Sequence, residues 1–210
     1  NNKGEYDKAI GYYEKALAIS IKALGAEHPL VAATYNNIGL AYDNKDEYDK
    51  ALFYYEKALA IELKALGANH PKVATIYQNI GTVYNAMDDV GKALSYYEKA
   101  LAIDLKALGA NHPKVATIYQ NIGTVYDEKG DYDKAIAYLE KALAIQVKVL
   151  GAEHPLVGAS YNNIGSAYIG YGNKLKAFTY FKNAKAIFLK KLGPQHASTK
   201  KVQAWIDLLK

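Results

Sequence analysis

LKALGANHPKVATIYQNIGTVY stands at Leu63–Tyr84, and the same 22 residues return unchanged at Leu105–Tyr126. The two copies lie 42 residues apart, and the histidines keep that step along the whole chain. Each histidine follows Leu-Gly and two further residues; the five are His28, His70, His112, His154 and His196. Self-similarity at a step of about 20 to 50 residues is typical of a solenoid, in which each unit buries its apolar face against its neighbours. The period therefore predicts a repeat array whose function lies on a surface.

Each 42-residue unit carries the signals of two helices. Proline is tolerated at the first position of a helix, so Pro71 predicts the start of a first helix of about 15 residues. The same start is predicted at Pro29, Pro113 and Pro155. After a polar break, a second helix is expected from about Asp49 to Leu66, with a left-handed stop at Gly67. Apolar residues at three- and four-residue steps give this second helix one broad apolar stripe.

The unit resembles the tetratricopeptide repeat, whose signature is an aromatic residue, Leu-Gly, Tyr, Ala-x-x-x-Phe and a further Ala. The signature stands here as Tyr35, Ile38, Gly39, Tyr42, Ala51, Tyr55 and Ala58, and it recurs from Tyr77, Tyr119 and Tyr161. The longer repeat with the phrases LGxxHPxVA and YNNIGxxY looks like the kinesin light chain type of tetratricopeptide domain. The resemblance implies a right-handed superhelix whose inner wall is lined by first helices and binds peptides.

We therefore expect an all-α, right-handed superhelical solenoid of antiparallel helix pairs, with about ten helices in a single domain. The predicted divisions are a partial repeat over 1–28, full repeats over 29–70, 71–112, 113–154 and 155–196, and a C-terminal capping helix over 197–210. There is no initiating Met and no signal-peptide pattern, so the chain is expected to be part of a longer protein.

The two ends of the array differ. Asn1-Asn2-Lys3-Gly4 aligns with Asp43-Asn44-Lys45-Asp46, so the helix over about 7–24 is expected to lack a first-helix partner. Part of its stripe should then be bare and mediate self-association; we expect this of Ile10, Tyr13, Leu17 and Leu24. At the other end, Trp205, Asp207 and Lys210 stand where the repeat has Asn, Gly and Tyr, which predicts a polar cap.

Composition argues against several classes of function. The chain has 210 residues, no cysteine and no apolar run near the length of a membrane span. All 26 basic residues are lysine, and lysine lacks the planar fork with which arginine grips phosphate. The lysines alternate with acids, so the net charge of +5 predicts a solvated surface rather than nucleic-acid binding. We expect a cytoplasmic protein with no membrane or nucleic-acid partner.

Catalytic and metal chemistry find no support in the residues. One histidine per repeat cannot supply a shared metal site, because neighbouring helix axes are about 8 to 10 Å apart. Each histidine stands before a helix start, where a helix cap or inter-repeat hydrogen bond is the expected role. The serines lack a nucleophile-elbow context, and no Gly-rich phosphate loop follows a strand. The chain is expected to have no enzymatic activity, no cofactor and no metal.

Mid-helix glycines and recurring tyrosines are assigned to the core. Gly39, Gly81, Gly123 and Gly165 each cost about 0.5 to 1 kcal/mol relative to alanine, so a packing reason is required. We expect Tyr55 and Tyr97 to pack against the bare backbone of the partner helix. Most of the 20 tyrosines recur at core-facing steps.

The candidate site comprises first-helix residues outside the core stripe. Mid-helix asparagine is unfavourable, so an asparagine at the same place in four repeats needs a reason. The resemblance implies that such a ladder holds the backbone of an extended peptide, whereas the alternative is that these amides bond a neighbouring helix. The predicted peptide-binding residues are Asn36, Asn37, Thr75, Gln78, Asn79, Thr82, Thr117, Gln120, Asn121, Thr124, Asn162, Asn163 and Ser166.

The predicted function is a non-enzymatic scaffold that binds an extended peptide or partner protein in the groove lined by first helices. First helices carry almost no cation, since only Lys72 and Lys114 lie near a helix start. Recognition of an acidic tail is therefore not expected, and binding should use main-chain hydrogen bonds. Two alternatives stay open: a self-assembling structural array, and a helical-repeat RNA reader, against which the absence of arginine counts.

Overall fold

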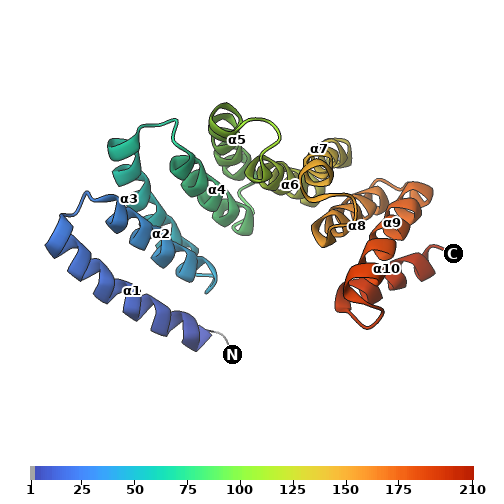
Figure 1. The fold of residues 1–210 in the computed structure, drawn as a ribbon, viewed down its shortest axis with the longest axis horizontal. Coiled ribbons are helices and arrows are strands. Elements are labelled where there is room, and N and C mark those ends of the chain that lie inside the picture. The colour runs from blue at the N-terminus through green and yellow to red at the C-terminus, as the bar shows by residue number, and fades with distance from the viewer. Residues whose placement is uncertain (1–2) are drawn as a thin grey trace. The chain divides into compact units, whose positions relative to one another are not determined.

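The computed structural model describes residues 3–210, and all ten regular elements in that range are α-helices (Figure 1). Their bounds are α1 Lys3–Leu24, α2 Pro29–Asp43, α3 Tyr48–Leu66, α4 Pro71–Ala86, α5 Val90–Leu108, α6 Pro113–Glu128, α7 Tyr132–Leu150, α8 Pro155–Gly170, α9 Lys174–Leu192 and α10 Ala197–Leu208. The all-α class and the expected ten helices are confirmed. The alignment of Asn1 and Asn2 with the end of a first helix lies outside the described residues.

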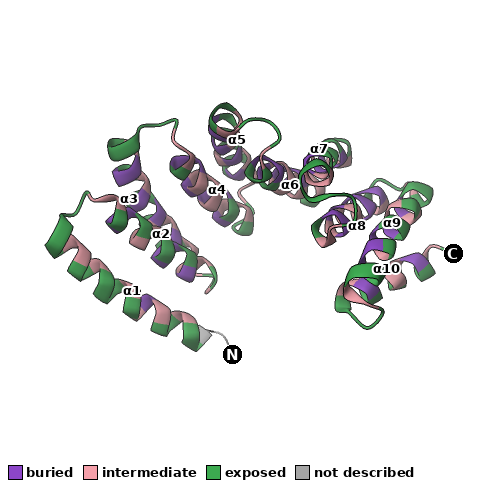
Figure 2. Cartoon of the chain, viewed as in Figure 1, coloured by how far each residue is buried: buried purple, intermediate pink, exposed green. Residues whose placement is uncertain are grey.

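The chain forms two compact units, residues 1–107 and 108–210. In unit 1, α1 packs on α2, α2 on α3 and α3 on α4. In unit 2, α6 packs on α7, α7 on α8, α8 on α9 and α9 on α10. Buried residues lie mainly on the helix sides that face one another within a unit (Figure 2). Each unit is therefore a stack of consecutive helices held together by nearest-neighbour contacts.

The histidines cap the helices that follow them. In α4, Nδ1 of His70 accepts a hydrogen bond from the backbone N–H of Lys72 at 3.2 Å. The same bond, at 3.1 to 3.2 Å, starts α2, α6, α8 and α10 from His28, His112, His154 and His196. A side-chain acceptor at this position satisfies one of the unpaired N–H groups of the first turn. The expected capping role is confirmed.

The glycines that end the second helices adopt a different conformation from the expected left-handed stop. Gly67 has φ 80° and ψ 165°, and Gly151 and Gly193 lie close to these values. This region is accessible essentially to glycine alone, and its high ψ leads the chain away from the helix in an extended direction. The predicted helix end at this glycine is confirmed, but its ψ differs from the left-handed value; the next residues form a turn in which the N–H of His70 donates to the Gly67 carbonyl at 3.4 Å.

The mid-helix glycines permit close helix contact. A Cβ atom added at Gly39 would stand 2.8 Å from the ring of Tyr55, and one at Gly81 would stand 2.9 Å from the ring of Tyr97. The same crowding occurs at Gly123 with Leu139 and at Gly165 with Phe181, each at 2.8 Å. The expected packing of second-helix side chains against bare backbone is confirmed.

Half-buried tyrosines form a second, outer contact between paired helices. In the first full repeat, Tyr54 of α3 lies between Tyr35 and Tyr42 of α2, with ring centroids 6.0 and 5.5 Å apart. Equivalent triads surround Tyr96, Tyr138 and Tyr180. Tyr12 and Tyr171, which are 72% and 50% exposed, are exceptions to the expectation that most tyrosines face the core.

The bare side of α1 differs in large part from the predicted stripe. Ile10 is buried, Tyr13 is half-buried and Leu17 packs against the core of unit 1, whereas Leu24 is 46% exposed. The most exposed large apolar residues of α1 lie outside the stripe: Tyr12 at 72% and Ile19 at 69%. Their equivalents in α3 are the stacked Tyr54 and the buried Ile61, and α3 has its own first helix, α2, beside it. The uncovered side of α1 is thus the one that a first helix covers in a complete repeat.

Candidate functional site

The candidate residues lie on what we call the first-helix face: the solvent-facing side of α2 and α4 in unit 1, and of α6 and α8 in unit 2. None of the thirteen predicted residues is buried. Asn37, Thr82 and Thr117 are exposed, and the other ten are half-buried. A mid-helix polar residue that stays in reach of solvent can bond a ligand, so the face is accessible to a partner.

The asparagine ladder has two kinds of member. Asn79 Nδ2 donates to Asn36 Oδ1 at 2.9 Å, which joins α4 to α2. This bond is of the kind expected if the amides bond a neighbouring helix rather than a ligand. Among the described residues, the side chains of Asn37, Gln78 and Asn121 make no hydrogen bond. One rung therefore holds neighbouring repeats of unit 1 together, while Asn37 and Gln78 in unit 1 and Asn121 in unit 2 keep both donors and the acceptor for a ligand.

The threonines of the face bond their own helices. Thr82 Oγ1 donates to the Gln78 carbonyl at 3.1 Å and lies 3.0 Å from the hydroxyl of Tyr97. Thr75, Thr117 and Thr124 donate to the carbonyl four residues earlier, at 3.1 to 3.2 Å. A hydroxyl that donates back to its helix can still accept a hydrogen bond. These threonines fit a role as acceptors for peptide N–H groups.

In unit 2, hydrogen bonds between one hydroxyl and two side-chain amides join three helices. Ser160 Oγ of α8 donates to Gln146 Oε1 of α7 at 2.5 Å, and Gln146 Nε2 donates to Gln120 Oε1 of α6 at 3.4 Å. Asn162 Nδ2 donates to Asn163 Oδ1 at 3.4 Å. Asn162 Oδ1 is buried with no hydrogen-bond partner among the described residues. The face of unit 2 is therefore more fully bonded within the chain than that of unit 1.

Sequence reasoning missed one set of residues at this face, which comes from the second helices. One position near the C-terminal end of the second helix recurs every 42 residues, and it is occupied in turn by Glu62, Asp104, Gln146 and Phe188. Glu62 is 3% and Asp104 1% exposed, although both are acids. The signal was present in the sequence, because this position changes from an acid to an amide and then to phenylalanine along the repeats.

Glu62 lies beneath a pocket of about 180 Å³ on the first-helix face of unit 1. The pocket is lined by Ala32, Ala33 and Asn36 of α2, by Glu62 of α3, and by Lys72, Thr75 and Ile76 of α4. Lys72 Nζ stands 3.6 Å from Glu62 Oε1. The small side chains of α2 leave the space open, so the carboxylate forms the floor of a polar hollow between two first helices.

Each unit has an acid with a raised pKa at the C-terminal end of a first helix. Partial burial raises the pKa of Asp43 above its usual value, and the charge of Asp46 adds to the effect. Partial burial likewise raises the pKa of Asp127, with Glu128 adding to it. Both shifts reflect the cost of holding a carboxylate away from water near a like charge.

Residues 3–210 contain neither a metal-ligand cluster nor a helix that could span a membrane. No group of three or more His, Cys, Asp or Glu residues in that range is placed to hold a metal ion. The histidine rings are occupied as helix caps, as described above. Across the same range, none of the helices combines the length and apolarity needed to cross a bilayer.

The fold and face define a helical-repeat protein of the antiparallel-pair type. The sequence pattern described as tetratricopeptide repeat matches residues 1–64, 45–106, 72–146 and 128–190, so the chain belongs to the tetratricopeptide repeat family. Proteins of this family bind other proteins or peptides and are typically non-enzymatic scaffolds. The chain is accordingly a scaffold of the protein-interaction type.

Solved structures support this assignment. BtubC (BKLC) from P. vanneervenii is 29% identical with a TM-score of 0.81, covering 90% of this chain and 76% of that one. A putative kinesin light chain with nearly identical TPR-like repeats from Podosopora anserina is 29% identical with a TM-score of 0.74, covering 89% of each chain. RapI in its apo form shares only the fold, at 19% identity and a TM-score of 0.74, covering 94% of this chain and 52% of that one. A comparison with curated proteins gave no match.

Proposed function

We propose that the chain binds an extended peptide segment of a partner protein on its first-helix face, through the residues predicted from the sequence. The observation that carries the proposal is that all thirteen polar residues stay at least partly exposed, while Val31, Ile38 and their equivalents on the core side of the same helices are buried. Amide groups at Asn37, Gln78 and Asn121 offer donors and acceptors for a peptide backbone. An extended strand presents alternating N–H and C=O groups, which such a face can pair without reading side chains.

The expected affinity follows from the chemistry of the face. Neutral hydrogen bonds contribute about 0.5 to 1.5 kcal/mol each, so a few of them give modest affinity and weak sequence preference. Asn121 is the better probe than Asn79, because Asn79 also bonds Asn36.

The proposal is tested by selecting linear peptides from a random display library against the full chain and measuring affinity by calorimetry. Asn121→Ala should weaken binding by about 0.5 to 1.5 kcal/mol and leave the melting temperature nearly unchanged, since it removes no hydrogen bond within the chain. Asn79→Ala should weaken binding and also lower stability, because Asn36 loses its partner. Unchanged affinity in both variants would show that the amides are structural.

We also propose, as a second role, that α1 mediates self-association with the α1 of another copy of the chain. The supporting observation is the uncovered row of Tyr12, Ala16 and Ile19, whose equivalents in α3 are stacked or buried. Two such faces are self-complementary, as a two-fold symmetric contact requires. The row is short, so the association should be weak and dependent on concentration.

A further inference from the structure

Glu62 is a buried carboxylate that the chain itself leaves incompletely paired. Its side chain is 4% exposed, and Oε2 is buried without a hydrogen-bond partner among residues 3–210. Its one ion-pair partner there, Lys72, stands 3.6 Å from Oε1, beyond hydrogen-bond distance, and the Lys72 side chain is 56% exposed. Burying a carboxylate costs free energy unless the group is paired and hydrogen-bonded, so a donor from outside the chain would stabilise Glu62.

The equivalent positions in unit 2 show that the repeat itself does not need an acid here. Gln146 fills the position with an amide that accepts from Ser160 and donates to Gln120. Phe188 fills it with a ring, and a Cβ atom at Gly158 would stand 2.8 Å from that ring. Both arrangements close the space with groups of the chain. At Glu62 the same position carries a carboxylate beneath an open pocket, which points to a ligand rather than to the architecture.

We propose that the pocket over Glu62 receives the cationic side chain of a lysine or arginine in the bound peptide. The inference rests on the proposed function and names the residue class that this face selects. A pocket of about 180 Å³ has room for the end of such a side chain. An arginine fork donates to both oxygens of a carboxylate, which would satisfy Oε2 and Oε1 together. Asn36 also lines the pocket, and its Oδ1, which accepts from Asn79 Nδ2, keeps a second lone pair.

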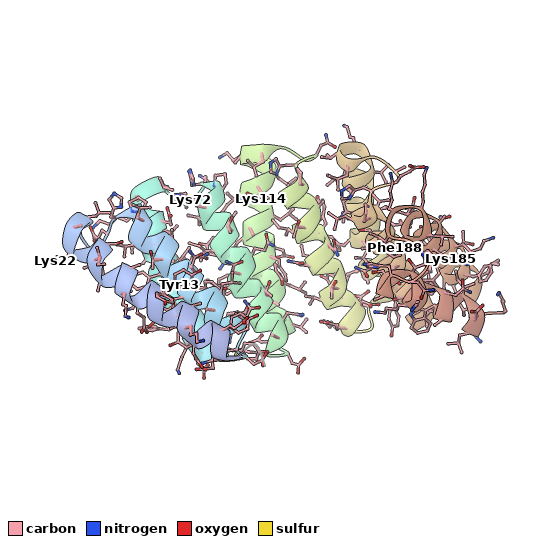
Figure 3. All side chains as sticks on the ribbon, turned by 60° about the horizontal axis from the view of Figure 1, so that its bottom comes forward. Tyr13, Lys22, Lys72, Lys114, Lys185 and Phe188 are labelled. Carbon is pink, nitrogen blue, oxygen red and sulfur yellow. The ribbon has the colours of Figure 1, made fainter. Side chains whose placement is uncertain are left out.

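Lys72 acts as the resident cation at the rim of this pocket. It lies in the first turn of α4 (Figure 3), and its long exposed side chain can turn toward solvent when a peptide cation enters. Because it competes for the same carboxylate and repels a second positive charge, it lowers the affinity for a basic peptide. Removing its charge should therefore strengthen binding, which is the opposite of the effect expected if Lys72 recognised an acidic peptide.

The test uses display selection of random linear peptides on the full chain, on Glu62→Gln and on Glu56→Gln. Glu56 is exposed on the same helix and serves as the matched control. Wild type and Glu56→Gln should enrich arginine or lysine at one fixed place in the peptide, and Glu62→Gln should bind peptides without that enrichment. Glutamine occupies the equivalent place at Gln146, so the variant is expected to fold; a thermal melt checks this.

Affinities of one selected peptide then decide the assignment. Exchanging its arginine for citrulline should weaken binding to wild type roughly tenfold or more and change binding to Glu62→Gln little, because the charged bond is already lost. Lys72→Gln should bind the arginine peptide more tightly than wild type does. If Glu62→Gln does not fold, this comparison tests whether the peptide cation binds at Glu62. Selected peptides without basic enrichment, or an unchanged preference in Glu62→Gln, would overturn the inference and leave the proposed function standing. Failure to select any peptide would overturn both.

Discussion

The same few residues fix the ends of every helix pair in this molecule. A histidine ring accepts the N–H of the first helical turn, and a glycine with φ near 80° to 87° ends each second helix. Because these bonds form between residues two apart, they depend on local sequence and hardly on the rest of the fold. This explains how a chain can repeat one unit with small changes and keep its geometry.

The histidine cap predicts a graded response to substitution. Replacing His70 with Ala should destabilise its unit by about 0.5 to 2 kcal/mol, because the N–H of Lys72 loses its acceptor. His70→Asn should recover most of that loss, since asparagine is among the best capping residues. Urea denaturation of the three proteins measures the difference. Equal stability of His70→Ala and wild type would show that water replaces the ring without cost.

The mid-helix glycines predict opposite effects at two similar positions. Gly81→Ala should destabilise by about 1 to 3 kcal/mol, because the new Cβ atom meets the ring of Tyr97 at 2.9 Å. Gly91→Ala should be neutral or stabilise by up to about 1 kcal/mol, since the nearest atom is 3.8 Å away and alanine favours the helix. Chemical denaturation of both variants checks the sign. A loss of stability at both positions would rule out close packing as the reason for Gly81.

At the level of the helices, an ion-pair cluster fastens α1 to the turn between α2 and α3. Lys45 Nζ lies 2.6 Å from Asp7 Oδ1 of α1 and 2.5 Å from Glu47 Oε1, and Lys50 Nζ lies 2.6 Å from Glu47 Oε2. Hydrogen bonds from Lys45 and Lys50 lower the pKa of Glu47 from about 4.5 to about 2. The charged form of Glu47 is thus favoured by the fold.

This pKa shift predicts a loss of stability in acid. A carboxyl whose pKa is lower in the folded state contributes its stability above the unfolded value and loses it as the pH falls toward the folded value. The contribution of Glu47 should therefore be complete above about pH 5 and vanish near pH 2. The melting temperatures of wild type and Glu47→Gln should converge over that range, with Glu56→Gln as the control. A constant difference down to pH 2 would contradict the role of the cluster.

The uncovered side of α1 gives a prediction about association. Sedimentation of the wild type should show a concentration-dependent dimer, and Tyr12→Lys with Ile19→Lys should abolish it by placing charges in the contact. The matched control is Lys15→Glu, which changes the charge of α1 near the same row without adding to the buried area. A monomer at all concentrations in wild type would show that water covers this side at no cost.

The structure shows what the sequence could predict at this level and what it could not. Helix starts, glycine contacts and caps were predicted correctly because each depends on a few neighbouring residues. The bare stripe of α1 was placed on Ile10, Tyr13, Leu17 and Leu24, of which Leu24 is exposed, whereas Tyr12 and Ile19 were missed, since a second helix is apolar on two adjacent sides. The periodicity of apolar residues shows that both sides of the helix are apolar, but it does not show which side each neighbouring helix covers.

Glu62 was missed for a related reason. In the sequence analysis, the apolar positions of the second helix were assigned to the core and the polar positions to the solvent-exposed side. An acidic residue on a helix is usually exposed, so Glu62 fell in the second group. Only the packing of α2 and α4 around the end of α3 shows that this residue is buried beneath the first-helix face. The outcome for the thirteen predicted site residues is different: all lie at least partly exposed on first helices, and their role in binding stays a prediction.

For the molecule as a whole, the central claim is that the first-helix face holds an extended peptide. A crystal structure of the chain with a display-selected peptide tests it most directly. The account predicts an extended peptide along the first helices of a unit, with its backbone within hydrogen-bond distance of the side chains of Asn37 or Gln78 in unit 1, or of Asn121 in unit 2. A peptide bound to the outer side of the second helices, or to the loops between pairs, would contradict it.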